Sequence, residues 1–207
     1  MDIQFYGANT IKLTTKKASV VIDDNLADLG LKTIAKPGDI MLFTGAHGMH
    51  PEAKIVVDQP GEYEASDVSI IGIAARAHLD EPGQLEATIY KLVVDDLRVA
   101  VVGHIYPELS DEQLETLGTV DVLFLPVGGN GYTLDSIGAL HIIKEIEPKL
   151  VIPTHYADQA LTYPVPQQSL EDALKNLAME PKETVTKLKL KAGELGDITQ
   201  LIILERQ

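Results

Sequence analysis

Short apolar runs rich in β-branched residues dominate the first hundred residues of this 207-residue chain. Each run is bounded by Gly, Pro, Asp or Asn, which is the pattern of β-strands separated by turns. The pattern predicts strands at 17–23, 39–43, 53–58, 67–75, 87–95 and 97–103. The peptides read as turns are PGD (37–39), PGEYE (60–64) and DDL (95–97).

A helical period of 3.6 residues becomes visible only in the second half of the chain, where it predicts helices at 110–118, 133–148 and 166–179. We expect Ser110 to cap the first helix, and Ser169 or Gln168 to begin the third. The second helix is amphipathic and stops at Pro148, since proline cannot continue a helix. Its apolar stripe is expected to consist of Ile137, Leu140, Ile143 and Ile146.

Further strands are predicted between and after these helices, at 120–127, 149–155, 183–194 and 198–206. In the segment 183–194, Leu188 and Leu190 alternate with lysines, as in a half-buried edge strand. We expect this strand to pair with 198–206. No repeat, low-complexity tract or linker interrupts the chain, so residues 1–207 are expected to form a single α/β domain.

The composition disfavours several classes of protein. Hydrophobic residues make up 45% of the chain and charged residues 23%, which is typical of a folded globular protein. The absence of cysteine excludes disulfides, thiolate nucleophiles and cysteine-based metal sites. The formal net charge of −14 disfavours a nucleic-acid partner, because binding phosphates requires an excess of Lys and Arg. With no signal peptide and no apolar stretch near the ~20 residues of a membrane span, we expect a cytoplasmic protein without a membrane partner.

Histidines follow four of the predicted strands, at or close to the point where each apolar run ends. They are His47, His50, His78, His104 and His155. In layered α/β folds, binding groups collect beyond the carboxyl ends of strands. If the four strand ends share one edge, a metal ion is the natural ligand, because neutral imidazole binds zinc and related ions. Otherwise each histidine is a turn residue bonded to backbone. His141 lies within a predicted helix and is read as structural or exposed.

Other catalytic motifs are missing. The peptide GGNG (128–131) lacks the spacing of a dinucleotide-binding fingerprint, and neither a P-loop nor a G-x-S-x-G elbow is present. The carboxylates that follow the strand 17–23 are Asp23 and Asp24. Asp24 is interpreted as a strand-ending turn residue. For Asp23, a turn and a supporting role behind a metal ligand are both open.

Several stretches resemble the metallo-β-lactamase superfamily, in particular its predicted zinc-dependent hydrolases that include L-ascorbate-6-phosphate lactonase-like proteins. The most specific is VDVLFLPVGGNGYTLDSIGALHIIKEIEPKLVIPTHY, beginning at residue 120; PGDIMLFTGAHGMHPE, DQPGEYEASDVSIIGIAARAH and LRVAVVGH also match. The resemblance covers nearly the whole chain. It implies an αββα sandwich, in which two mixed sheets are flanked by helices and metals bind at one edge.

The resemblance also shows departures from the superfamily's metal ligands. Gly45 and Met49 stand where the H-x-H-x-D-H loop has its first histidine and its aspartate, and His104 stands at the bridging aspartate. Ala8 replaces a further polar position near the start. Without either carboxylate, a two-metal centre is not expected, because anionic ligands hold two dications together. At most one zinc or other divalent ion is expected per chain, or none.

Two ligand sets are implied for a single metal: His47, His78 and His104, or His50, His104 and His155. With such a metal, the chain would hydrolyse a small ester, lactone or phosphoester, and His50 or His155 would transfer the proton. The alternative is a catalytically inactive pseudoenzyme that serves as a binding or regulatory module. A small-molecule substrate is expected, and the sequence leaves a homo-oligomer open.

Overall fold

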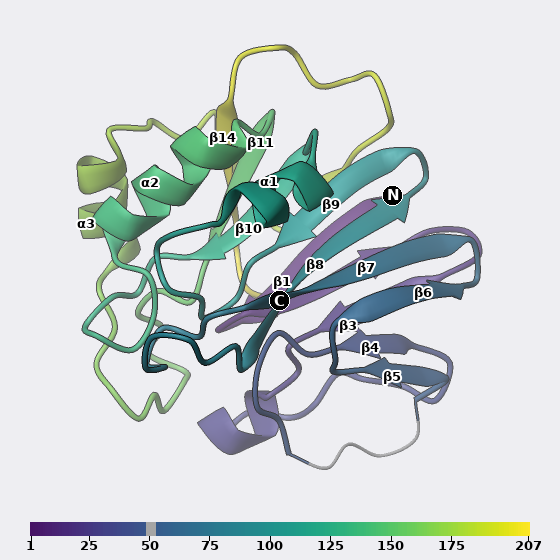
Figure 1. The fold of residues 1–207 in the computed structure, drawn as a ribbon, viewed down its shortest axis with the longest axis horizontal. Helices are drawn as coiled ribbons and strands as arrows, with labels where there is room; N and C mark the ends of the chain where they lie inside the picture. Colours follow the sequence, from purple (N-terminus) through teal and green to yellow (C-terminus); the bar gives the residue numbers. More distant parts are fainter. Residues whose placement is uncertain (49–52) are drawn as a thin grey trace.

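Two mixed β-sheets lie face to face in the computed structural model, which describes residues 1–48 and 53–207 (Figure 1). The smaller sheet has six strands, in the spatial order β13 (Leu188–Lys189), β1 (Asp2–Gly7), β2 (Thr10–Thr14), β3 (Ser19–Ile22), β4 (Ile40–Leu42) and β5 (Ile55–Val57). The larger sheet has eight, in the order β12 (Glu183–Val185), β14 (Gln200–Leu204), β11 (Leu150–Thr154), β10 (Val122–Pro126), β9 (Leu97–Val101), β8 (Ala87–Val94), β7 (Val68–Ala75) and β6 (Gly61–Ala65).

Each sheet combines an antiparallel part with a parallel part. In the smaller sheet, β3, β4 and β5 are parallel; in the larger one, β9, β10, β11, β14 and β12 are parallel. Parallel strands end at the same edge of their sheet. His104 and His155 follow parallel strands of the larger sheet, β9 and β11, and so lie at the same edge of that sheet. His47 follows β4 of the smaller sheet. Ligand-binding loops collect at such strand ends.

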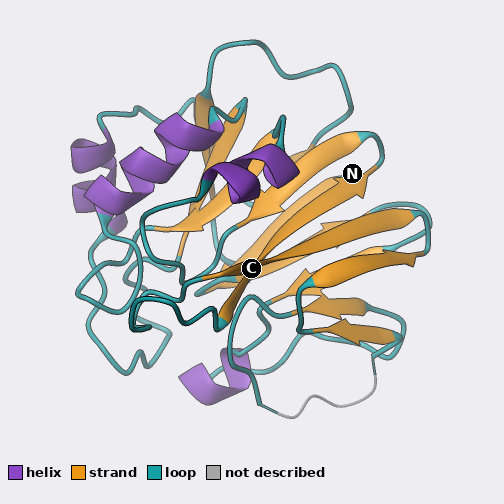
Figure 2. Ribbon diagram, viewed as in Figure 1, coloured by secondary structure: helices purple, strands orange, loops and turns teal. Residues whose placement is uncertain are grey.

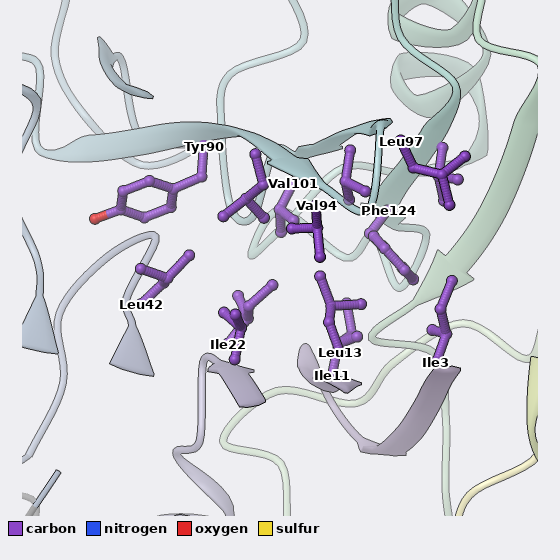
Figure 3. Packing of buried hydrophobic residues seen from close by; sticks show 14 of the residues in the cluster. Ile3, Ile11, Leu13, Ile22, Leu42, Tyr90, Val94, Leu97, Val101 and Phe124 are labelled. Atoms are coloured by element: carbon purple, nitrogen blue, oxygen red, sulfur yellow. The ribbon is translucent and has the colours of Figure 1, made fainter. Parts of the chain in front are cut away.

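The core between the sheets consists of side chains that project from both inner faces (Figure 3). Those of the smaller sheet include Ile3, Ile11, Leu13, Ile22 and Leu42, and those of the larger one include Tyr90, Val94, Leu97, Val101 and Phe124. All of these side chains are almost completely excluded from solvent. Burial of such branched and aromatic side chains contributes roughly 1.5–3 kcal/mol each, which makes this layer the main source of stability.

Three α-helices lie together on the outer side of the larger sheet (Figure 2). They are α1 (Asp111–Leu117), α2 (Ser136–Ile146) and α3 (Leu170–Leu177). The expected caps are observed: Ser110 forms a capping box with Gln113, and Ser169 caps α3. A short 3-10 helix, η1 (Leu26–Leu29), follows β3. Two mixed sheets with outer helices match the sandwich expected from the sequence.

Two expected elements differ from the structure. PGEYE is not a turn: residues 61–65 form β6, because β7 offers an edge with which they pair in antiparallel register. The segment 183–194 is not one strand, since β12 pairs with β14 in the larger sheet and β13 pairs with β1 in the smaller one. Leu188 and Leu190 nevertheless enter the core, as the alternation predicts.

One member of the expected apolar stripe of α2 does not face the sheet. Ile137 is 75% exposed, whereas Ile142, Ile143 and Ile146 are buried and Leu140 packs partly buried against them. At 3.6 residues per turn, Ile137 lies about 140° around the helix from Ile142, and so faces away from the sheet. His141 is exposed and pairs with Glu145, as predicted.

Candidate functional site

The ends of strands from both sheets meet at one edge of the sandwich. The His155 N–H, after β11, donates to the Ala8 carbonyl, after β1, at 2.8 Å. The His78 N–H, after β7, donates to the His104 carbonyl, after β9, at 2.7 Å. The Thr44 side chain, after β4, packs closely against Gly103: a Cβ atom placed on Gly103 would be 2.1 Å from Oγ1 of Thr44. These contacts bring four histidine-bearing loops to the same edge.

His104 and His155 form an imidazole pair at this edge, with His155 buried and His104 partly buried. Their ring centroids are 4.5 Å apart, and the rings meet edge to face at 83°. Tyr132 lies 5.1 Å from His104, and Tyr163 lies 5.0 Å from His155, both measured between ring centroids. His155 is only 4% exposed. The pair therefore lies in a largely dry, aromatic environment.

Burial keeps both imidazoles neutral at pH 7. It lowers the pKa of His155 to about 4, although the hydrogen bond to Gln167 opposes this change. Burial also lowers the pKa of His104 well below its usual value of 6.5, and the nearby His155 and His78 add to this effect. A neutral imidazole has a free lone pair, and it is the form that ligates metals or accepts a proton.

The chemistry of the pair fits two ligands of a divalent metal site. The Nδ1 atom of His104 is buried and makes no hydrogen bond within the described residues. An unpaired buried polar atom costs free energy, and ligation of a metal would remove that cost. A third ligand is not in place: among residues 1–48 and 53–207, no three His, Asp or Glu side chains are arranged to hold a metal.

A buried carboxylate supports the loop that follows β4. Asp23 accepts hydrogen bonds from the Thr44 N–H at 2.7 Å and from its hydroxyl at 2.6 Å. Burial raises the pKa of Asp23 to about 6, against the opposing effect of these two bonds. Thr44 also packs on Gly103, the residue before His104. Asp23 therefore supports, through Thr44, the backbone next to one histidine of the pair. Asp24 is structural: it accepts from the backbone N–H groups of residues 34 and 35.

The profile of the family described as Beta-lactamase superfamily domain matches residues 2–155, well over half of the chain. The chain belongs to the metallo-β-lactamase superfamily. A UPF0173 metal-dependent hydrolase of Salinibacter ruber is 27% identical over 198 residues, which cover 75% of this chain and 84% of that relative.

Solved structures of metallo-β-lactamase proteins share the fold. A candidate Zn-dependent hydrolase from Thermotoga maritima superposes with a TM-score of 0.76 at 22% identity, covering 99% of both chains. A candidate metal-dependent hydrolase from Parabacteroides distasonis gives a TM-score of 0.65 at 21% identity, covering 99% of this chain and 93% of the other. The fold of this chain is the metallo-β-lactamase fold.

The other histidines of this superfamily member have different surroundings. The His47 ring stacks on Phe43 with 4.0 Å between ring centroids, and its Nε2 lies 3.1 Å from Oδ2 of Asp58. The set of His47, His78 and His104 is not assembled as a metal site in the described structure. His50 and Met49 lie outside the described residues. The set of His50, His104 and His155 therefore stays a prediction, of which the structure brings two members together.

Sequence reasoning missed several residues that shape this site, namely Thr44, Tyr132, Tyr163 and Gln167. Tyr132 follows GGNG, a peptide that matches the superfamily and lacks a dinucleotide-binding fingerprint, but its sequence does not single out the tyrosine. The sequence predicts that Gln167 lies at the start of a helix, yet it contacts His155.

None of the helices in the described parts of the chain combines the length and apolar character required to cross a bilayer.

Proposed function

We propose that this metallo-β-lactamase-fold protein is a metal-dependent hydrolase of a small ester, lactone or phosphoester, acting with at most one divalent metal ion per chain. The observation that carries the proposal is the neutral pair of His104 and His155 in edge-to-face contact at the strand-end edge of the fold. The name of the Salinibacter ruber relative, metal-dependent hydrolase, supports the same reaction class.

The limit of one metal follows from the charge of the donor set. Two dications held a few ångströms apart require anionic ligands between them. By the sequence resemblance, His104 stands where the superfamily has its bridging carboxylate, and burial, which lowers its pKa, keeps it neutral. Asp23, the buried carboxylate at this edge, has both oxygens occupied by Thr44. Among the described residues, no carboxylate is hydrogen-bonded to His104 or His155, where a bridging anion would be needed.

The roles of the two histidines follow from their nitrogens. His104 would supply as a ligand its Nδ1, which has no hydrogen-bond partner among the described residues. His155 has one nitrogen bonded to Gln167, so its Nε2 can either ligate the metal or accept a proton, but not both at once. A bound divalent ion supplies Lewis-acid activation of the substrate's carbonyl or phosphoryl oxygen. If His155 ligates, proton transfer falls to His50.

Zinc titration by calorimetry tests the proposal, with His104→Ala compared with the wild type. We expect the wild type to bind one equivalent and His104→Ala to lose most of that affinity. His141→Ala is the matched control, because His141 is exposed and its ion-pair partner among the described residues is Glu145. Folded wild-type protein that binds no divalent metal, or unchanged zinc binding by His104→Ala, would contradict the proposal. A screen of simple lactones and phosphodiesters with the loaded protein then tests turnover.

The alternative, an inactive binding module, is supported by the absence of three assembled ligands among the described residues. A repair variant distinguishes the two functions. Gly45→His, Met49→Asp and His104→Asp together restore the superfamily's ligand types. If the backbone frame still suits metals, the triple variant should bind more zinc than the parent. Single changes should do little, because ligands of one centre act together. Unchanged binding in a folded triple variant favours the binding module.

A further inference from the structure

A glutamine outside the superfamily's ligand positions contacts the histidine pair. Gln167 lies between α2 and α3 in the sequence, in the segment PVPQQ (164–168). Its Oε1 is 3.1 Å from Nδ1 of His155, and its Nε2 donates to the Val165 carbonyl at 2.6 Å. Both ends of the amide are thus engaged.

The Val165 contact determines the orientation of the amide. If the amide were turned by 180°, its oxygen would face the Val165 carbonyl, and two acceptors would oppose each other. The observed orientation therefore presents an oxygen to His155. Because an amide oxygen carries no hydrogen, Nδ1 of His155 must carry the proton of this hydrogen bond, and the lone pair of the ring must be on Nε2.

The backbone around Gln167 is built to hold this contact. A Cβ atom on Gly128 would be 2.1 Å from Gln167 Oε1 and 2.2 Å from the His155 carbonyl, so only glycine leaves room for the amide. The Gln168 N–H donates to the Gly128 carbonyl at 2.7 Å, and the Asn130 amide bonds to the Pro166 carbonyl. The segment is thereby tied to the loop after β10.

The backbone of His155 is equally constrained. Its φ angle is 51°, in the left-handed region that non-glycine residues rarely adopt. Its N–H donates to Ala8. A residue held in this conformation at a strand end needs support from its surroundings, and such sites are commonly functional.

We propose that Gln167 is the positioning residue of His155: it holds the proton on Nδ1 and leaves Nε2 as the nitrogen available to a ligand or proton. The functional use of Nε2 rests on the function proposed above, but the tautomer does not. In metal sites, a partner of this kind on the other ring nitrogen sets the orientation of the ligating histidine.

Nitrogen-15 NMR of histidine-labelled, metal-free protein at one fixed pH tests the tautomer. We expect His155 in the wild type to carry its proton on Nδ1. Gln167→Leu removes the side-chain acceptor and leaves the His155 ring with its backbone hydrogen bond, so the Nε2-protonated form should become populated. Gln167→Glu loses the donor to Val165 but keeps an oxygen that can accept from His155, so His155 should keep its proton on Nδ1. Gln168→Leu is the control, because the Gln168 side chain binds Ser136 and should leave His155 unchanged.

Three outcomes would overturn the inference: an Nε2-protonated His155 in the wild type, an unchanged tautomer in folded Gln167→Leu, or an equal change in Gln168→Leu. If Gln167→Leu does not fold, the wild type and Gln167→Glu still decide, because both must show Nδ1–H. In the zinc titration, Gln167→Leu should weaken affinity by about 10-fold or more. A wild type with the expected tautomer but without metal binding would refute the proposed function and leave this inference standing.

Discussion

Replacement of Asp23 by asparagine should change the pH dependence of stability in a direction opposite to that of most carboxylates. Burial raises the pKa of Asp23 from 3.8 to about 6, so the folded protein holds this proton more tightly than the unfolded chain. The stability that the protonated form provides is complete below pH 3.8 and is lost as the pH rises through 6. A difference of about two pH units corresponds to about 3 kcal/mol at about 1.4 kcal/mol per unit.

Asparagine retains the shape and can still pair with the Thr44 N–H and hydroxyl. Asp23→Asn should therefore gain stability relative to the wild type as the pH rises from 4 to 8, by about 2–3 kcal/mol. Urea unfolding of both proteins at several pH values measures this difference. Any constant cost of the amide cancels, because only the change with pH is compared. A difference that stays the same from pH 4 to pH 8 would refute the reasoning.

Three further substitutions test the packing and pairing around the sheets by chemical denaturation. Gly128→Ala should destabilise the protein by about 1–3 kcal/mol, because its Cβ would collide with Gln167; unchanged stability would contradict the close approach. Asp121→Asn should lower the free energy of unfolding by about 2 kcal/mol at pH 7, because the Arg98 hydrogen bond lowers the pKa of Asp121 to about 2. The stability difference between variant and wild type should shrink as the pH falls from 4 to 2. A deficit that persists undiminished at pH 2 would count against that ion pair. Ser110→Ala should cost about 1 kcal/mol through loss of the α1 cap, and Ser110→Asp should recover it.

The strands and helices could largely be predicted because their signals are local. Alternation, β-branched runs and capping residues such as Ser110 and Ser169 act within a few residues of where they occur. The errors arose where tertiary pairing decided. Residues 61–65 carry turn signals, yet β7 recruits them as a strand. The segment 183–194 looks continuous, yet its two halves join different sheets.

The site could be predicted only in part, for the same reason. The rule that ligands collect at strand ends selected five histidines, and the structure places two of them, His104 and His155, in contact. No rule of spacing could find Gln167, because its contact depends on how residues 164–168 pack against Gly128. Likewise, the link from Asp23 to Gly103 passes through Thr44, whose role is visible only when two sheets are packed together.

The most direct test of the central claim is elemental analysis of the protein purified without a histidine tag after expression with added zinc. A single centre built on His104 and His155 predicts one divalent ion per chain, and His155→Ala or His104→Ala should reduce that content while His141→Ala leaves it unchanged. Two tightly held ions per chain would contradict the account, because no carboxylate of the described residues contacts the histidine pair to bridge them. A folded protein with no bound metal would contradict it equally.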